Sequence, residues 1–249
     1  MRHATLILGF GGRRLVVDPI LSPAGSMPPI DNSANDRRNP LVELPVNENE
    51  IFGADAYLLT HTHRDHFDAA AAERLPKDKP VFCQPADLEK LAGMGFNQAT
   101  AVEKSVEWRG LRLCRTGGRH GSGALAEKMG PVSGYVLQAD GEPSLYIAGD
   151  TVWCDEVAAA LAAHKPAVIV LFAGAAQFLT GGPITMAAGD VLAVLAAAPQ
   201  ARVVAVHMET FNHCLLTRAG LAAALADAGQ ADRVIIPNDG ETIKFYLKA

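Results

Sequence analysis

The stretch Ala56-Tyr57-Leu58-Leu59-Thr60-His61-Thr62-His63-Arg64-Asp65-His66 decides how this 249-residue chain is read. Its apolar first half, Ala56–Leu59, is typical of a buried strand. Its second half places three imidazoles and a carboxylate within six residues, in a chain with only 8 histidines. Imidazole nitrogens and carboxylate oxygens are ligands that zinc and similar ions bind. The stretch therefore predicts a strand that ends at a metal site.

Further along the chain, ligand-type residues follow runs of β-forming residues in the same way. They are His120, Asp150 and His207. A ligand at the end of a strand is held by a rigid scaffold, and the loop beyond it is free to shape a pocket. With the four residues of the first stretch they make seven ligand-type groups, enough for two ions with open coordination positions.

These residues carry a resemblance to a known family. In the motif His61-x-His63-x-Asp65-His66, and then in His120, Asp150 and His207, the chain resembles the metallo-β-lactamase fold superfamily in order and spacing. The segments 2–5 and 15–19 also resemble the branch that contains the ascorbate-6-phosphate lactonase. The resemblance covers nearly the whole chain. It implies an α/β fold, a four-layer αββα sandwich, formed by residues 1–249 as a single domain.

The resemblance also implies a role for each of the seven residues. One ion would be bound by His61, His63 and His120, the second by Asp65, His66 and His207, and Asp150 would bridge both. The nucleophile would be a metal-bridging hydroxide, which Asp65 could orient. Two ions ~3.5–4 Å apart lower the pKa of water and stabilise both the attacking and the leaving oxygen. Zinc is the expected metal, with manganese or iron as alternatives, because His/Asp sets suit several metals.

Three more residues are candidates for supporting roles. Asp18 follows a strand-like run and is expected to hydrogen-bond a ligand imidazole, although an Asp that only starts a turn is the alternative. His3 is expected near the pocket, with a structural histidine as the alternative. His213, six residues after His207, is a candidate catalytic residue that donates a proton to the leaving group or binds substrate.

The order of the predicted elements places β-hairpins first and helix–strand units after them, which fits sheets covered by helices on their outer faces. The runs 4–8 and 14–17 predict a hairpin around the glycine-rich segment 9–12. Helices are predicted over residues 69–75, 85–93, 155–163, 184–197 and 217–228. Further strands are predicted over residues 54–60, 80–84, 102–108, 111–116, 134–138, 144–147, 168–172, 203–207, 234–236 and 242–247.

The composition excludes several classes of protein. A net charge of -5 without a basic cluster argues against nucleic acid or an anionic membrane as a partner. No run reaches the ~20 apolar residues that a membrane span needs. The 4 cysteines lie far apart, so a disulfide framework is not expected. No export signal is visible, and a cytoplasmic location is expected.

Together these observations favour a metal-dependent hydrolase that cleaves a small ester, lactone or phosphoester. The alternatives are a phosphodiesterase or nuclease acting on nucleic acid, and a non-catalytic metal-binding protein. A di-iron redox protein is disfavoured because those relatives carry Glu in place of His63 and have an attached flavin domain. Specificity for a small-molecule substrate is expected in the segments 22–49, 121–132 and 175–185. A homo-oligomer is left open, and the Pro-rich segment 22–49 could provide its contact.

Overall fold

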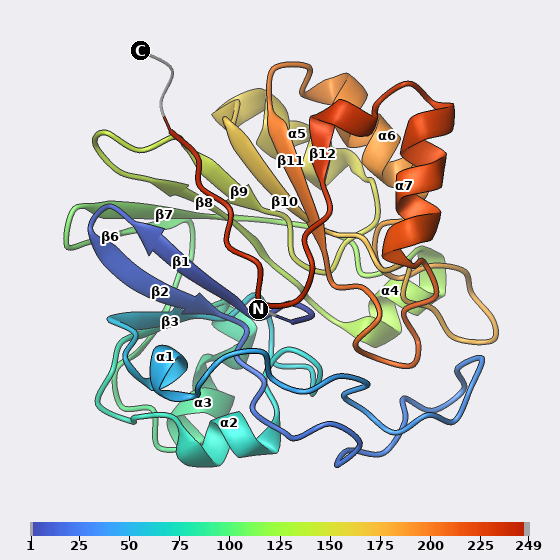
Figure 1. Ribbon diagram of the computed structural model, residues 1–249. Coiled ribbons are helices and arrows are strands. Elements are labelled where there is room, and N and C mark those ends of the chain that lie inside the picture. Colours follow the sequence, from blue (N-terminus) through green and yellow to red (C-terminus); the bar gives the residue numbers. More distant parts are fainter. Residues whose placement is uncertain (1, 247–249) are drawn as a thin grey trace.

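The computed structural model describes residues 2–246 and arranges them in four layers (Figure 1). Two β-sheets face each other at the centre, and helices cover the outer face of each sheet. This arrangement is the αββα sandwich that the sequence predicts, so the prediction of the fold class is confirmed.

The first sheet has the strand order β1-β2-β3-β4-β5. β1 and β2 form the predicted antiparallel hairpin, and the turn between them uses Gly11 and Gly12 at positive φ, a conformation that glycine adopts without strain. The remaining neighbours pair in parallel, so β2 and β3 end at the same edge. The strands are β1 (Leu6–Phe10), β2 (Arg13–Val17), β3 (Ala56–Leu58), β4 (Val81–Cys83) and β5 (Ala99–Ala101).

The second sheet has the strand order β12-β11-β10-β9-β8-β7-β6. Its half from β12 to β9 is parallel, and its half from β9 to β6 is antiparallel. The strands are β6 (Ser105–Trp108), β7 (Leu111–Thr116), β8 (Gly134–Gln138), β9 (Leu145–Ile147), β10 (Val168–Phe172), β11 (Arg202–Val206) and β12 (Val234–Ile235).

The helices bury one apolar side each against a sheet. On the first sheet lie α1 (Asn49–Phe52), α2 (Ala69–Arg74) and α3 (Leu88–Gly93), the last preceded by the 3₁₀ turn η1 (Pro85–Asp87). On the second lie α5 (Asp155–His164), α6 (Ala188–Ala197) and α7 (Arg218–Asp227), the last followed by the 3₁₀ turn η2 (Ala231–Arg233). α4 (Gly123–Met129) packs through Leu125 and Met129 on a smaller cluster that contains Ile184. No helix among residues 2–246 is long and apolar enough to cross a membrane.

The ends of several strands place unusual backbone conformations close together. Asp18 follows β2 and has φ 42°, and His207 follows β11 and has φ 67°. His3, whose carbonyl accepts a hydrogen bond from the His207 amide at 3.2 Å, has φ 55°. Left-handed backbone is strained for residues with a Cβ and is commonest at functional sites. These residues therefore mark the end of the sandwich where the candidate site lies.

One predicted helix begins later than expected. α6 starts at Ala188 and not at Ile184. The Ile184 amide instead donates to the Ala176 carbonyl at 2.7 Å, and the Met186 amide donates to the Phe172 carbonyl at 3.2 Å. These bonds tie the backbone of residues 184 and 186 to earlier parts of the chain, and the helix begins after them.

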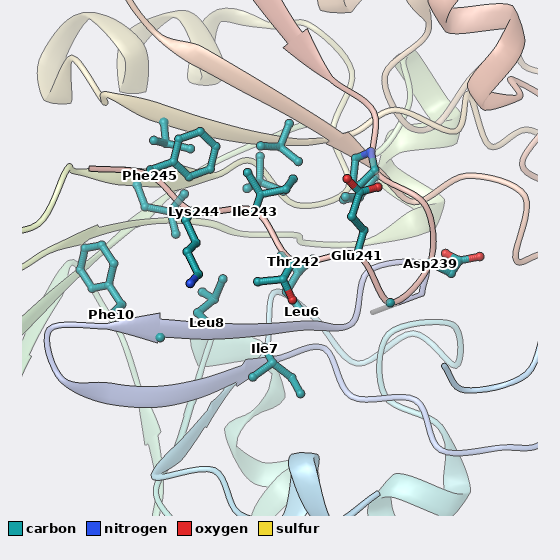
Figure 2. Close-up of a pocket in the computed structure, with 18 of the residues that line it drawn as sticks. Leu6, Ile7, Leu8, Phe10, Asp239, Glu241, Thr242, Ile243, Lys244 and Phe245 are labelled. Atoms are coloured by element: carbon teal, nitrogen blue, oxygen red, sulfur yellow. The ribbon is translucent and has the colours of Figure 1, made fainter. Parts of the chain in front are cut away.

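The predicted last strand is wrong in its described part. Residues 242–246 join neither sheet, and residue 247 lies outside the described range. Their side chains still alternate as in a strand: Figure 2 shows Ile243 and Phe245 turned toward the second sheet and Lys244 turned toward β1. The alternation that predicted a strand is therefore real, but no hydrogen-bonded ladder accompanies it among these residues.

Candidate metal centre

The first four candidate ligands, within residues 61–66, follow β3 in a tight turn. The amides of His66 and Phe67 both donate to the His63 carbonyl, at 2.9 and 2.8 Å. This reversal brings the side chains of residues 61–66 to one side before α2 begins. Asp68 then caps α2 by accepting a hydrogen bond from the Ala71 amide at 2.7 Å.

His61, His63 and His120 form one group of three imidazoles. One nitrogen of each lies within 4.8 Å of the others, and His61 Nε2 is 3.0 Å from His63 Nδ1. His120 Nδ1 can donate to the Ile184 carbonyl at 2.8 Å, which leaves its Nε2 lone pair facing the group. The structure thus brings together the residues that the sequence assigned to the first ion.

Asp65, His66 and His207 form a second group, and His3 lies within it. Their ligand atoms lie within 4.8 Å of one another. His66 Nε2 is 3.2 Å from His207 Nε2, and Asp65 Oδ2 is 3.8 Å from each of these two nitrogens. These are the residues that the sequence assigned to the second ion.

Asp150 lies between the two groups. Its Oδ2 is 3.2 Å from His66 Nε2, 3.5 Å from His120 Nε2 and 4.0 Å from His61 Nε2. Its Oδ1 is 3.3 Å from His207 Nε2 but is buried without a hydrogen-bond partner among the described residues. A buried carboxylate oxygen without a donor is costly, and a cation at this place would satisfy it. The donor set therefore fits divalent metal ions.

Gly149 allows Asp150 to reach this position. Its φ is 72°, and a Cβ there would lie 2.4 Å from the Ser133 carbonyl oxygen. Glycine is therefore required at the turn that follows β9.

Asp18 orients one of the ligand rings, as the sequence predicted for a supporting carboxylate. Its Oδ2 accepts from His66 Nδ1 at 2.8 Å and from Thr60 Oγ1 at 2.6 Å, and its Oδ1 accepts from the Thr60 amide at 2.8 Å. A proton held on His66 Nδ1 leaves Nε2 as the nitrogen that faces Asp150. The Thr60 hydroxyl oxygen also lies 3.1 Å from His61 Nδ1.

The charged groups of the centre shift one another's pKa values. Burial lowers the pKa of His61 and of His207 well below the usual range. Burial alone would raise the pKa values of Asp65 and Asp150, but the neighbouring His66 charge holds both well below normal. Burial alone would lower the pKa of His66, but Asp150 and Asp65 raise it well above normal. A cation bound between Asp150 and Asp65 would replace the positive charge of the His66 proton, so that His66 could bind it as a neutral ring.

His3 and His213 flank the Asp65 carboxylate. His3 Nε2 lies 3.3 Å from Asp65 Oδ2, and His213 Nε2 lies 3.7 Å from the same oxygen. Both rings are buried, and the Nδ1 atom of each has no hydrogen-bond partner among the described residues. His3 also packs on His207, with ring centroids 3.6 Å apart. The structure therefore places both residues beside the centre, where the sequence expected them.

Sequence reasoning missed three residues that support the centre. Thr60 holds Asp18, as described above, and the Cys214 thiol lies 3.6 Å from His207 Nδ1. Asn212, two residues before Cys214, hydrogen-bonds Ile30 and Asn39 and so fastens its loop to the segment 28–39. Thr60 had a signal, because it is the polar residue at the end of a buried strand, whereas a cysteine or asparagine in a loop carries none.

A pocket of about 380 Å³ opens beside the centre. We call it the site pocket. His63, Asp65, His120 and His213 line it together with apolar side chains; the remaining lining residues are Ile30, Asp31, Asn32, Arg64, Met129, Phe178 and Ile184. The Arg64 guanidinium donates to the Pro29 carbonyl at 2.6 Å. The site pocket therefore combines metal-ligand side chains with a wall suited to an apolar group.

A larger hollow of about 880 Å³ lies between the sheets, along β1 and residues 239–246 (Figure 2). Its lining combines apolar side chains such as Leu8 and Val170 with charged ones such as Glu142 and Lys244. Of the seven proposed ligands only His207 reaches it. The smaller site pocket, which exposes both groups of donors, is therefore the better candidate for chemistry.

Comparison with known proteins agrees with this fold. The beta-lactamase superfamily domain matches residues 13–208. The UPF0173 protein YddR of Bacillus subtilis is 35% identical over 249 residues, 98% of each chain. A UPF0173 metal-dependent hydrolase of Azorhizobium caulinodans is 29% identical over 252 residues, 97% of each chain.

Among solved structures, isothiocyanate hydrolase from Delia radicum gut bacteria superimposes with a TM-score of 0.94. It is 38% identical, and the match covers 99% of this chain and 98% of that one. Because the matched domain spans most of the chain and the relatives align along nearly their whole length, the chain belongs to the beta-lactamase superfamily, among the UPF0173 proteins.

Proposed function

We propose that the chain is a metal-dependent hydrolase with a dinuclear centre that cleaves a small molecule. The observation that carries the proposal is the convergence of two donor groups on Asp150, whose buried Oδ1 has no hydrogen-bond partner among the described residues. The first ion would be held by His61, His63 and His120, the second by Asp65, His66 and His207, and Asp150 would bridge them.

Two bound divalent ions would supply a water of lowered pKa, and so a hydroxide nucleophile at neutral pH. The residues of the chain orient the metal ligands and the attacking water. Asp18 fixes the His66 ring through the 2.8 Å hydrogen bond to Nδ1. The Asp65 carboxylate lines the site pocket and is placed to accept a hydrogen bond from the attacking water. Zinc remains our first choice of metal, with manganese or iron as alternatives.

His213 would act on the substrate as a neutral hydrogen-bonding group. Burial lowers its pKa to about 4, so the ring is uncharged at pH 7. It lines the site pocket beside Asp65. A neutral ring there can donate an N–H hydrogen bond to the substrate, which favours substrate binding over proton donation, the two roles that the sequence suggested.

We propose an isothiocyanate as the first substrate class to test. The relative that carries this activity in its name aligns along almost the whole chain. An isothiocyanate is uncharged, has an electrophilic central carbon and carries an organic arm that the apolar wall of the site pocket could hold. Water would attack the central carbon, the nitrogen would take both protons, and cleavage of the carbon–nitrogen bond would release an amine and carbonyl sulfide.

Ester or lactone cleavage is the second candidate, because the same nucleophile attacks a carboxyl carbon. A phosphoester is less suited to the site pocket, since its only Lys or Arg side chain, Arg64, is engaged with the Pro29 carbonyl. Nucleic acid is disfavoured by the net charge of -5 and by the small volume of the pocket. A non-catalytic metal-binding protein would bind ions without turning over any of these substrates.

The experiment is to strip the protein with a chelator, reload it with Zn²⁺, Mn²⁺ or Fe²⁺, and assay turnover. Benzyl isothiocyanate, an aryl ester, a γ-lactone and an aryl phosphodiester cover the bond types. We expect metal-dependent turnover that the Asp65→Ala and His120→Ala variants lose, while the matched control His164→Ala at the end of α5 keeps it. Turnover by the stripped protein would contradict the proposal, and tight metal binding without any turnover would favour the non-catalytic alternative.

A further inference from the structure

Part of the lining of the site pocket comes from a long segment with little regular structure. Ile30, Asp31 and Asn32, from the Pro- and Asn-rich segment 22–49, line the pocket together with the donor residues, and we call these three residues the wall. A segment of this length could move as a lid or stand as a fixed wall. Which of the two holds depends on what fastens it.

The buried side chain of Asn212 fastens this wall to the loop that carries His213. Asn212 Oδ1 accepts from the Ile30 amide at 2.8 Å and from Asn39 Nδ2 at 2.9 Å. Its Nδ2 donates to Ser33 Oγ at 2.6 Å and to the Asn35 carbonyl at 2.8 Å. Only 2% of Asn212 is exposed, so water cannot replace these bonds at no cost.

The backbone of Asn212 extends the same attachment. Its amide donates to Asn39 Oδ1 at 2.8 Å, and its carbonyl accepts from Asn35 Nδ2 at 2.9 Å. Nearby, the Leu41 amide donates to the Thr210 carbonyl at 2.7 Å. The side chain of Asn212 thus acts as donor and as acceptor toward the segment 30–39. Only an amide side chain offers both an oxygen acceptor and an N–H₂ donor in this way.

Two further contacts fasten the wall at the mouth of the pocket. The Leu179 amide donates to the Asn32 carbonyl at 2.6 Å, and Arg64 donates to the Pro29 carbonyl at 2.6 Å. Phe178, next to Leu179, lines the pocket itself. The wall is therefore held from the metal-ligand turn, from the segment around Phe178 and, most extensively, from Asn212.

We propose that Asn212 is a positioning residue that fixes the Ile30 wall at a set distance from His213 and so limits the length of the apolar arm of the substrate. The part of the proposal that concerns substrates rests on the proposed function. Asn212 does not touch the substrate; it acts through Ile30 and Asn32. A fixed wall gives a size limit, whereas a mobile lid would adapt to arms of different length.

The informative substitution is Asn212→Asp. It keeps the acceptor for the Ile30 amide but replaces the Nδ2 donor with a carboxylate oxygen that faces the Asn35 carbonyl. Asn47→Asp is the matched control, because Asn47 lies in the same segment away from the site pocket and uses only an acceptor, for the Asn49 amide. Both proteins are studied with zinc bound, and protection of the β10 and β11 amides shows that each remains folded.

The first measurement is hydrogen exchange of individual amides. We expect the Ile30 amide to exchange about tenfold faster in Asn212→Asp, the equivalent of one buried hydrogen bond, and to be unchanged in Asn47→Asp. Unchanged exchange at Ile30 would overturn the proposal. This measurement needs no substrate, so it decides the fastening of the wall even where the proposed function fails.

The second measurement is kcat/KM for n-alkyl isothiocyanates from methyl to hexyl. In the wild type we expect the values to fall with arm length beyond the size of the pocket. In Asn212→Asp the penalty for the longer arms should shrink by about fivefold, through KM rather than kcat. An unchanged length preference together with faster exchange would overturn the role in specificity. Lack of turnover by the wild type would contradict the proposed substrate instead, and the exchange result alone would then decide.

Discussion

At the scale of single residues, Asp18 sets the orientation of the His66 ring, one of the proposed ligands. Asp18 accepts from His66 Nδ1 at 2.8 Å and is held by both the amide and the hydroxyl of Thr60. The sequence predicted that Asp18 would hydrogen-bond a ligand imidazole, with a turn-starting Asp as the alternative. Neither its φ of 42° nor its two hydrogen bonds to Thr60 could be predicted from the residue type.

Replacing Asp18 with Asn removes the carboxylate and leaves the shape of the side chain. We expect affinity for the second ion to fall about 10–100-fold, because partners of ligand imidazoles orient the rings and raise their basicity. Competition with a fluorescent chelator measures this affinity, and Asp140→Asn in an exposed turn is the control. Equal zinc affinity in both variants would show that Asp18 only shapes the turn after β2.

His213 makes the stability of the metal-free protein depend on pH. Burial lowers its pKa from 6.5 to about 4, so between these values the unfolded chain binds a proton that the folded chain does not. The free energy of unfolding therefore falls as the pH drops through this window. We expect the melting temperature of chelator-treated wild type to fall more between pH 6.5 and 4 than that of His213→Gln. Parallel curves would show that His213 is not held in its neutral form.

At the scale of elements, the hydrophobic pattern predicted most strands and the longer helices. The run Val168–Phe172 has a strong local signal, and the structure has a strand there. The predicted hairpin is also present, but its first strand covers residues 6–10 and not 4–8. The short elements α1, α4 and β5 were missed, because three to seven residues give little periodicity. α6 begins late because residues 184–186 find backbone partners in other parts of the chain, which no local pattern reveals.

Asp68 does more than cap the start of α2. Besides capping the Ala71 amide, Asp68 accepts from the amides of Leu21 and Ser22, and it is 1% exposed. We expect Asp68→Ala to lower the free energy of unfolding by about 3 kcal/mol, because buried donors are left unpaired.

The control for this cap is Thr217→Ala at the start of α7, where one bond to the Gly220 amide is lost. A loss of about 1 kcal/mol is expected there. Urea unfolding of the zinc-free proteins compares the two. Equal losses would mean that Asp68 acts only as a helix cap and does not fasten the start of segment 22–49.

At the scale of the whole molecule, the proposed ligands come from both sheets. His61, His63, Asp65 and His66 follow β3 of the first sheet, whereas His120, Asp150 and His207 belong to loops after strands of the second. The order of these residues along the chain predicted that they belong together. The site pocket was not predictable in detail, because its wall is built by contacts such as those of Asn212 that join distant segments.

Because the proposed ions would link the two sheets, metal removal should destabilise the whole sandwich. A free metal concentration of about 100 times the dissociation constant raises the free energy of unfolding by about 2.7 kcal/mol. For a chain of this length that corresponds to about 5–10 °C in melting temperature. Scanning fluorimetry before and after chelation, and after Zn²⁺ is added back, measures the shift. A melting temperature that does not respond to chelation would contradict the proposed link.

The central claim is that two ions, bridged by Asp150, are needed for hydrolysis. The most direct test is to titrate Zn²⁺ into metal-free protein while recording turnover of benzyl isothiocyanate and of the ester, lactone and phosphodiester probes, with bound zinc counted by mass spectrometry. We expect turnover to rise until about two zinc ions are bound per chain and to be absent throughout in Asp150→Ala. Full turnover without zinc, or undiminished turnover in Asp150→Ala, would contradict it.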